Sequence, residues 1–375
     1  MSNDKVFRIL SIDGGGIRGI IPATILKNIR KGTNKPLCQL FDLIAGTSTG
    51  GLLTLGLTKP NPYNKDTPDY TEDELFRFYK KDGKKIFDRS LLRKITSGDG
   101  WLDERYSSKG LKKVLRKRFG DTRLGDALTP VLITTYDMRG TRRINTADKE
   151  SPYSKNPQRN KGGHPRFFKS YRSEGPTDTD YLMRDVAHAT AAVPTYFEPH
   201  KIEYKARSKD KTVTRHQYET LIDGGIFANN PAMCAYAEAR RYFPEQKDFL
   251  LVSIGTGDTF EEQKYKKAKD WGKLEWARPL ISMILDGASD TVHYQLQQLL
   301  PKQGGTTQYY RFQPVLTTAY DSMDNADETN LNALKLIAKA LIDERREDIT
   351  EISDRLNSLE EQENMFKTVE DINNT

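Results

Sequence analysis

The apolar positions at the start of the chain predict two strand–turn–helix units, one directly after the other. Residues 6–12 form a short apolar run of strand length. The isoleucines that follow recur at helical spacing, which predicts a helix over about 18–31. The second unit has an apolar strand over 41–46, a turn over 46–50 and an apolar helix over 51–57. Each unit therefore places a glycine-rich turn between a buried strand and a helix.

The alternation of strands and helices continues along the chain. Apolar runs predict strands over 129–138, 218–223 and 249–257, while helical spacing predicts helices over 181–193 and 231–242. No run of hairpin signals separates these elements. We therefore expect an α/β fold with a parallel or mostly parallel central sheet and helices on both faces.

Three stretches depart from this alternation. Residues 148–180 are rich in Pro, Gly, Ser and Lys and predict a long loop. Residues 77–118 hold 15 Lys and Arg against 5 Asp and Glu, with a break in their helical pattern at 96–101. Residues 343–371 hold 4 Lys and Arg against 11 Asp and Glu, within a helical pattern that begins near 331. The basic stretch suits contact with an anionic surface, although a solvated helix face explains the same charges.

The composition indicates a folded chain without a membrane anchor. Its 375 residues are 36% apolar and 30% charged, with a net charge of +7. No segment approaches the roughly 18 consecutive apolar residues of a membrane span, and residues 1–13 lack the pattern of a secretory signal. Cys38 and Cys234 lie far apart without metal-ligand spacing. We expect one large domain or two smaller ones, with reduced thiols, in the cytoplasm.

The turn GTSTG, residues 46–50, matches the G-x-S-x-G pattern of a nucleophilic serine. That pattern needs a strand before it and a helix after it, and both are predicted here. Gly46 and Gly50 leave room for the two elements to approach closely, while Ser48 projects its hydroxyl from the apex of the turn. A turn without chemistry is the plain alternative, but the flanking elements favour a nucleophile.

A serine nucleophile needs a base, and five histidines are available. His188 falls inside a predicted helix, which suits a structural role, while His200 and His216 flank a basic loop. His293 follows Ser48 and an aspartate in the order of the α/β-hydrolases, so it stays a candidate. None of the five has a motif around it that marks it as the base.

Asp223 carries the stronger signal for a base. It ends a predicted strand just before Gly224 and Gly225, where open α/β sheets place functional groups. A carboxylate there could take the serine proton directly, provided that burial raises its pKa above the ordinary value of about 3.9. On its own, Asp-Gly is also a routine turn.

The first glycine turn, DGGGIRG at 13–19, can supply the amides that an acyl-transfer reaction needs. Gly14, Gly15 and Gly16 let backbone N–H groups point at a tetrahedral oxyanion, and Arg18 could add a cation or be an ordinary surface residue. No metal or cofactor is needed for this chemistry.

A dinucleotide site is the competing hypothesis for the same turn. Gly14, Gly16 and Gly19 fit G-x-G-x-x-G, which also calls for an acidic residue at the end of the next strand. Asp42 begins that strand instead of ending it, and Ser48 lies at its end. A nicotinamide-dependent oxidoreductase is therefore the weaker alternative.

Taken together, DGGGIRG, GTSTG and IDGG (222–225) resemble the patatin-like phospholipases. The stretches at 189–199, 223–231 and 250–257 agree, so the resemblance covers about 7–257. It implies a three-layer α/β/α fold with a Ser48–Asp223 dyad and no catalytic histidine. Further positions then follow from the family pattern: oxyanion residues Gly14, Gly15, Gly16 and Arg18, with supporting glycines Gly19, Gly46, Gly50, Gly224 and Gly225.

The resemblance also implies a domain plan and partners. A catalytic domain would span 1–330, with a basic helical insertion at about 75–120 and an acidic helical tail over 331–375. The substrate would be a phospholipid at a membrane surface, met from the cytoplasmic side, with no nucleic acid involved. The layout is similar to that of bacterial effectors that cyclic nucleotides activate in antiphage defence, although a housekeeping acyl hydrolase explains the same residues. A homo-oligomer is one option for its assembly.

Overall fold

A computed structural model describes residues 6–87, 106–139, 162–171, 180–207, 214–259, 268–269, 271–316 and 322–373. Its centre is an eight-stranded sheet in the order β5-β6-β3-β2-β1-β7-β9, with β4 paired to β3. The strands are β1 (Phe7–Ile12), β2 (Leu43–Thr47), β3 (Val131–Asp137), β4 (His164–Lys169), β5 (His200–Arg207), β6 (Thr214–Asp223), β7 (Phe249–Ile254) and β9 (Tyr309–Phe312). A separate short pair joins β8 (Asp258–Thr259) to β10 (Val315–Leu316).

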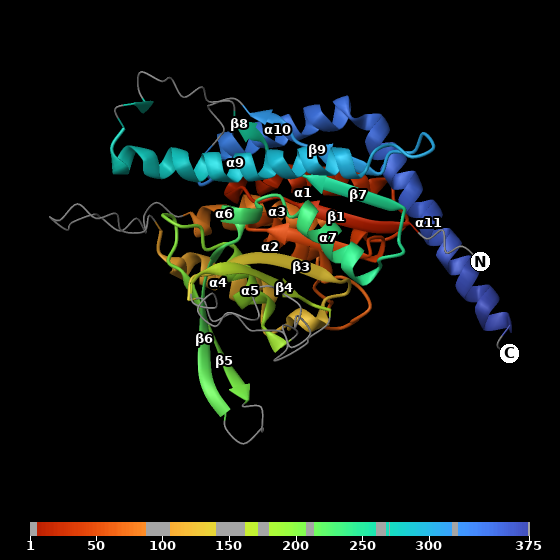
Figure 1. The fold of residues 1–375 in the computed structure, drawn as a ribbon, viewed down its shortest axis with the longest axis horizontal. Helices are drawn as coiled ribbons and strands as arrows, with labels where there is room; N and C mark the ends of the chain where they lie inside the picture. Colours follow the sequence, from red (N-terminus) through yellow and green to blue (C-terminus); the bar gives the residue numbers. More distant parts are fainter. Residues whose placement is uncertain are drawn as a thin grey trace.

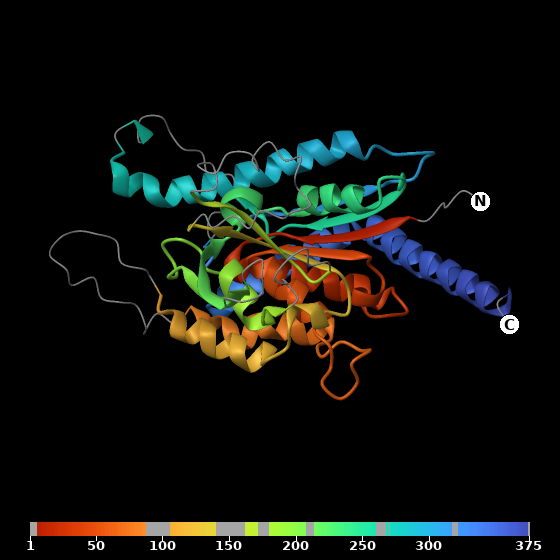
Figure 2. The same cartoon turned by 60° about the horizontal axis from the view of Figure 1, so that its bottom comes forward.

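Helices cover both faces of this sheet, which confirms the predicted three-layer α/β/α class (Figures 1 and 2). The helices are α1 (Ile20–Lys31), α2 (Thr49–Thr58), α3 (Glu72–Ile86), α4 (Ser108–Phe119), α5 (Met183–Thr190), α6 (Gly225–Ala228), α7 (Ala232–Tyr242), α9 (Lys273–Leu299), α10 (Glu328–Glu344) and α11 (Arg346–Asn373). In Figure 2, α9 lies above the sheet and the α3–α4 pair lies below it.

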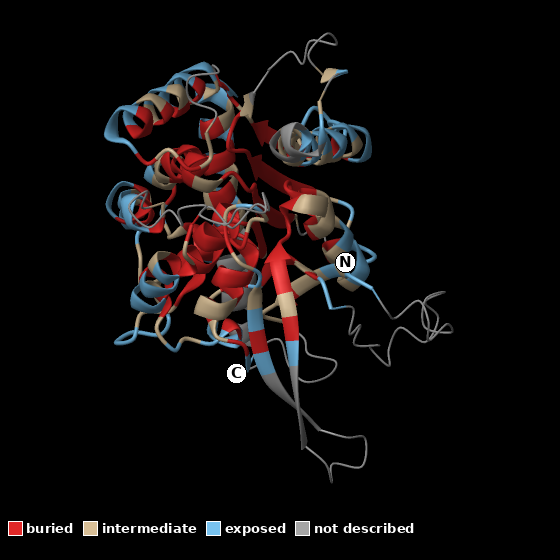
Figure 3. Cartoon of the chain, turned by 90° about the vertical axis from the view of Figure 1, so that its left-hand side faces the viewer, coloured by how far each residue is buried: buried red, intermediate tan, exposed pale blue. Residues whose placement is uncertain are grey.

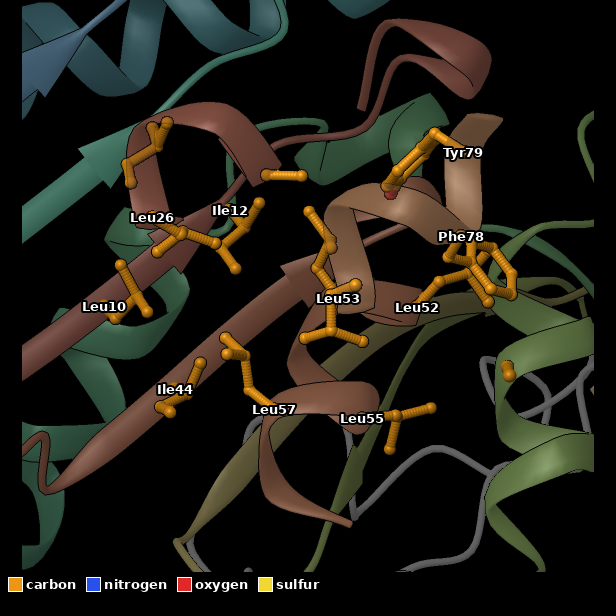
Figure 4. Close-up of a cluster of buried hydrophobic side chains, with 14 of the residues drawn as sticks. Leu10, Ile12, Leu26, Ile44, Leu52, Leu53, Leu55, Leu57, Phe78 and Tyr79 are labelled. Atoms are coloured by element: carbon orange, nitrogen blue, oxygen red, sulfur yellow. The ribbon is translucent and has the colours of Figure 1, made fainter. Parts of the chain in front are cut away.

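Successive side chains of β1 point to opposite faces of the sheet and enter two different hydrophobic cores. Leu10 and Ile12 belong to the larger core, which α1, α2 and α3 complete (Figure 4). Phe7 and Ile9 point to the other face and join a second core with α7 and the C-terminal part of α9. Both cores are almost fully shielded from solvent, and the buried residues gather along the middle of the sheet (Figure 3).

Neighbouring strands run parallel in the middle of the sheet and antiparallel at one side of it. Strand β1 pairs in parallel with β2 and β7, β2 with β3, and β7 with β9. The sequence carried no signal for a hairpin, yet β5 and β6 form an antiparallel hairpin and β6 runs antiparallel to β3. Residues of β5 such as His200, Lys201 and Glu203 are polar, so the strand lacks an apolar run.

Strand β4 corrects one prediction, since it lies within the stretch 148–180 that was expected to be a loop. It pairs antiparallel with β3, where Phe168 is buried against Ile133. Its composition, HPRFFK, has only one fully buried position, which explains why the apolar pattern missed it. The predicted break at 96–101 lies outside the described residues.

Helices α10 and α11 add buried side chains to the larger core. Helix α10 packs on α1, and α11 begins against the same helix. Leu334 of α10 and Ile352 and Leu356 of α11 are fully shielded from solvent. Among the described helices, none is long and apolar enough to cross a bilayer.

The substitution Leu334→Ala tests how much the α10 contact stabilises the core. Removing a fully buried leucine should lower the free energy of unfolding by about 2–5 kcal/mol, because transfer and cavity costs add. Urea unfolding measures the change. The matched variant Leu336→Ala, on the same helix but 64% exposed, should change it by less than about 0.5 kcal/mol. Equal effects of the two variants would contradict this packing.

Candidate active site

Ser48 lies in the sharp turn between β2 and α2. Its backbone has φ 54° and ψ −123°, a left-handed conformation that non-glycine residues rarely adopt. The turn is this tight because α2 begins directly against β1: a Cβ at Gly50 would come within 2.1 Å of the Ile12 carbonyl oxygen. The serine is nearly buried, with 5% of its surface exposed. Strain held by a close backbone contact is typical of a nucleophile turn.

A hydrogen-bonded chain fixes the strained serine from behind. The Ser48 amide donates to Oγ1 of Thr190 at 2.8 Å, and the Thr190 hydroxyl donates to the carbonyl of Thr134 at 2.8 Å. Thr190 ends α5 and Thr134 belongs to β3. The position of Ser48 is therefore fixed by a chain of contacts to both of these elements. The sequence analysis counted the stretch 189–199 toward the family resemblance but assigned no role to Thr190.

Asp223 lies at the end of β6 and is buried. Its amide donates to the carbonyl of Ala192 at 3.0 Å, and its Oδ1 accepts from the Gly225 amide at 2.7 Å. Its Oδ2 is buried and makes no hydrogen bond of normal geometry within the described residues. Burial raises the pKa of this carboxyl to about 7, and the nearby Ser48 hydroxyl and the Gly225 amide oppose the rise only in part.

Ser48 and Asp223 open onto the same cavity, together with the glycine loop. The other lining residues are mostly apolar: Gly15, Gly16, Phe87, Val193, Pro194, Tyr196, Gly225, Ile226, Asn229, Ile281, Leu285 and Met323. A second apolar hollow meets the same serine from the side of α2, α3 and α4, where Leu52, Phe78 and Leu111 line it. The serine is therefore reached through an apolar space from two directions.

The glycine loop after β1 is pressed against the serine turn. The Gly14 amide donates to the carbonyl of Asn229 at 3.1 Å, and a Cβ at Gly14 would lie 3.1 Å from Cβ of Ser48. Gly15 and Gly16 line the cavity directly. The next amide, that of Ile17, donates to the carbonyl of Met323 at 2.8 Å.

A buried ion pair anchors the start of this loop. Oδ2 of Asp13 accepts from Arg311 at 2.6 Å and from Ser289 at 3.3 Å. Arg311 comes from β9 and also donates to Ser253 of β7 at 2.9 Å. Burial still raises the pKa of Asp13 to about 6, although Arg311 lowers it. Sequence reasoning missed Arg311, because nothing around it marks a partner 298 residues away.

Arg18 is buried and contacts backbone carbonyls. Its guanidinium donates to Gly15 at 3.4 Å and to Gly257 at 3.3 Å, so it ties the glycine loop to the turn after β7. It also opposes the rise in pKa that burial imposes on Asp286. These contacts describe an arginine that positions the loop.

The histidines with described side chains lie in other surroundings. Nδ1 of His293 is 3.1 Å from the Tyr309 hydroxyl, beside a polar hollow that Asp290 and Arg345 also line. His188 and His200 stack on each other with ring centroids 3.9 Å apart. Burial lowers the pKa of His188 well below its usual range.

Asp42, the residue considered for a dinucleotide site, has a structural role. Asp42 accepts hydrogen bonds from the amide and guanidinium of Arg8, which ties the start of β2 to β1. No group of three or more His, Cys, Asp or Glu in the described part of the chain could hold a metal ion. Cys38 and Cys234 are free thiols whose pKa burial raises.

Comparisons with known proteins agree with this architecture. A family model described as "Patatin-like phospholipase" matches residues 10–236. Patatin-like protein 2 of Oryza sativa subsp. indica is 34% identical over 372 residues, covering 90% of this chain and 84% of its own. Patatin-like protein 1 of Arabidopsis thaliana is 30% identical over 371 residues, with 90% and 81% covered. Human GIVD cytosolic phospholipase A2 aligns with a TM-score of 0.47 and 9% identity, covering 96% of this chain and 61% of that one.

The three motifs that suggested the family therefore agree with matches along most of the chain. The family model covers more than half of the residues, and the plant relatives extend the likeness to nine-tenths of them. The chain belongs to the patatin-like phospholipase family.

Proposed function

We propose that this protein hydrolyses the fatty-acyl esters of phospholipids with Ser48 as nucleophile and Asp223 as its base. The observation that carries the proposal is the pairing of a strained, nearly buried serine with a buried aspartate of raised pKa in one apolar cavity. Membership of a lipid acyl hydrolase family supports the same reaction class.

The reaction follows from the positions of these groups. The Ser48 hydroxyl attacks the ester carbonyl and transfers its proton to Asp223. The tetrahedral intermediate collapses, the glycerol oxygen leaves with the proton from Asp223, and the acyl group stays on Ser48. Asp223 then takes a proton from water, whose oxygen attacks the acyl carbonyl. Collapse of this second intermediate returns the proton to Ser48 and releases the fatty acid.

The amides of Gly15 and Gly16 are the donors that we assign to the oxyanion. They line the cavity beside Ser48, whereas the Gly14 amide is already bonded to the Asn229 carbonyl. In this assignment Gly14 holds the loop close to the serine, and Arg18 orients it through the Gly15 carbonyl. Fixed donors at the site of developing charge lower the barrier because they need no rearrangement during the reaction.

The exposed faces of α3 and α4 suit an anionic lipid surface. Both helices border the second hollow at Ser48, through Phe78 and Leu111. Their solvent faces carry exposed lysines and arginines, called the basic patch below: Arg77, Lys80, Lys81, Lys84, Lys85, Lys109, Lys112, Lys113, Arg116 and Lys117. We propose that this patch attracts the enzyme to the bilayer that holds its substrate.

A more specific hypothesis about the same hydrolase is that a cyclic nucleotide activates it in antiphage defence. It rests on the resemblance to bacterial effectors, and a constitutive acyl hydrolase is the alternative. Assays with and without added cyclic dinucleotides separate the two, because an effector should be nearly silent without its activator. Calorimetric binding of NAD would instead support an oxidoreductase.

The variants Ser48→Ala and Asp223→Asn should each lower the hydrolysis of a fluorogenic phospholipid by at least about a thousandfold, because either change removes one half of a proton-transfer pair. His293→Gln serves as the matched control and should keep activity within about twofold, since His293 bonds to Tyr309 outside the cavity. Loss of activity in the His293 variant alone would overturn the dyad.

The pH dependence of kcat/KM should report the ionisation of Asp223. The base must be ionised, and its pKa is raised to about 7, so kcat/KM should fall about tenfold per pH unit below that value and level off above it. The raised folded pKa also means that the stability contributed by this group is present below about pH 4 and lost as the pH rises through about 7. A profile that is flat from pH 5 to 8 would contradict Asp223 as the base.

Charge reversal at Lys80, Lys81, Lys84 and Lys85 tests the basic patch. With all four changed to Glu, binding to anionic vesicles at low salt should weaken at least about tenfold, since each lysine near such a surface contributes about 1 kcal/mol. Co-sedimentation with vesicles measures it. Binding to zwitterionic vesicles should stay the same, and unchanged binding to the anionic ones would remove the proposal.

A further inference from the structure

The N-terminal half of α9 exposes an unusual line of large apolar side chains. Trp276, Leu280, Met283 and Ile284 are 38%, 47%, 40% and 39% exposed. Their spacing of four, seven and eight residues puts them within an arc of about 100° on one side of the helix. We call these four residues the apolar stripe. Half of the strongly exposed large apolar side chains in the described part of the chain lie on α9.

The opposite side of the same helical turns lines the catalytic cavity. Ile281 and Leu285 face the space that contains Ser48 and Asp223, and Leu285 is only 7% exposed. Helix α9 also packs on α6, which follows Asp223 directly. One helical segment therefore has one side in the cavity and a second apolar side in solvent.

We propose that the apolar stripe inserts into the outer layer of a lipid bilayer and places the cavity at the membrane surface. This rests on the proposed phospholipid hydrolase function and names the surface by which the enzyme reaches its substrate. A helix with tryptophan and aliphatic residues on one face lies in the interface plane with that face among the acyl chains. Trp276 suits the boundary with the headgroups, and Trp271 packs edge-on against it at 4.9 Å between ring centroids.

The charges around the site favour a bilayer over a second copy of this chain. Helices α3 and α4, whose solvent faces carry the basic patch, border the hollow at the same serine from the other direction. In Figures 1 and 2 these two helices lie toward the same end of the molecule as the N-terminal half of α9, on the other side of the sheet. Anionic headgroups meet the cations while acyl chains meet the apolar stripe. A symmetric contact between two copies that used this whole end would bring two basic patches together, which like-charge repulsion opposes, and a contact through α9 alone is an outcome of the test below.

Vesicle binding by the full-length Ser48→Ala protein tests the proposal without degrading the lipid. The stripe variant adds Trp276→Gln, Leu280→Gln, Met283→Gln and Ile284→Gln, which keep good helix formers on α9. The matched control adds Tyr294→Gln, Leu299→Gln and Leu336→Gln, at exposed apolar positions outside the stripe. Vesicles of phosphatidylcholine with phosphatidylglycerol are used, at low salt and at high salt, where charge attraction is screened.

The expected result is at least tenfold weaker binding of the stripe variant at high salt, with the control unchanged. The loss should persist with pure phosphatidylcholine vesicles, because insertion of apolar side chains needs no charge. Equal binding of the stripe variant and its parent would overturn the proposal. So would a parent protein that does not bind vesicles, or a parent dimer that the stripe substitutions convert to a monomer in light scattering.

Tryptophan fluorescence gives a readout that does not depend on the stripe variant folding. Brominated phosphatidylcholine should quench the emission of the Ser48→Ala protein and shift it to shorter wavelength. Adding Trp271→Phe and Trp276→Phe, which keep apolar rings, should remove most of the quenching but not the binding, because the two rings lie side by side. Emission that brominated lipid leaves unchanged would contradict insertion.

Hydrolysis of a soluble short-chain ester separates this proposal from the proposed function. With Ser48 present, the stripe variant should keep its rate on the monomeric ester within about twofold of wild type and lose at least tenfold on vesicles. If wild type fails on both substrates, the hydrolase function is wrong, while the binding measurements still decide whether the stripe meets a membrane. Equal losses on both substrates would show that the stripe acts on the cavity instead.

Discussion

The site depends on the contact between the ends of two neighbouring parallel strands. Strands β1 and β2 end at the same edge of the sheet, so the glycine loop and the serine turn that follow them meet there. Gly50 lies so close to the Ile12 carbonyl that no larger residue fits, and this contact holds Ser48 in a left-handed conformation. Thr190 and Thr134 then fix the turn from the other side. Ser48 and the glycine amides of the proposed oxyanion site are thus positioned by the sheet itself.

Two buried aspartates near this edge show how burial alone does not decide the chemistry of a carboxyl group. Asp13 is paired with Arg311 and Ser289, so its role is to hold the glycine loop to β9. No such cation from the described residues bonds to Asp223, and among them the Gly225 amide and the Ser48 hydroxyl oppose its desolvation. Burial raises the pKa of both carboxyls, so what separates them is their partners and the position of Asp223 on the cavity beside Ser48.

The surroundings of the dyad suit a substrate that is itself part of an apolar phase. Apolar residues reach Ser48 from α9 on one side and from α2, α3 and α4 on the other. The outer surfaces of these helices differ, because α3 and α4 are basic while α9 exposes large apolar side chains. The same helices thus shape the cavity and the surface around it.

The sequence by itself predicted most strands and helices up to residue 257, and it singled out Ser48 and Asp223, the residues of the proposed dyad. DGGGIRG, GTSTG and IDGG each lie at the end of a strand, as the apolar runs before them predicted, because turn glycines and apolar runs are local signals. It missed β4 and β5, whose polar faces carry no apolar pattern, and also β9 and the long helix α9. It left the roles of Arg18 and His293 open. Only the tertiary structure brought Thr190 to Ser48, Arg311 to Asp13 and the two sides of α9 to cavity and solvent. These contacts join residues far apart in the chain, and only the packing of the sheet and its helices decides which of them meet.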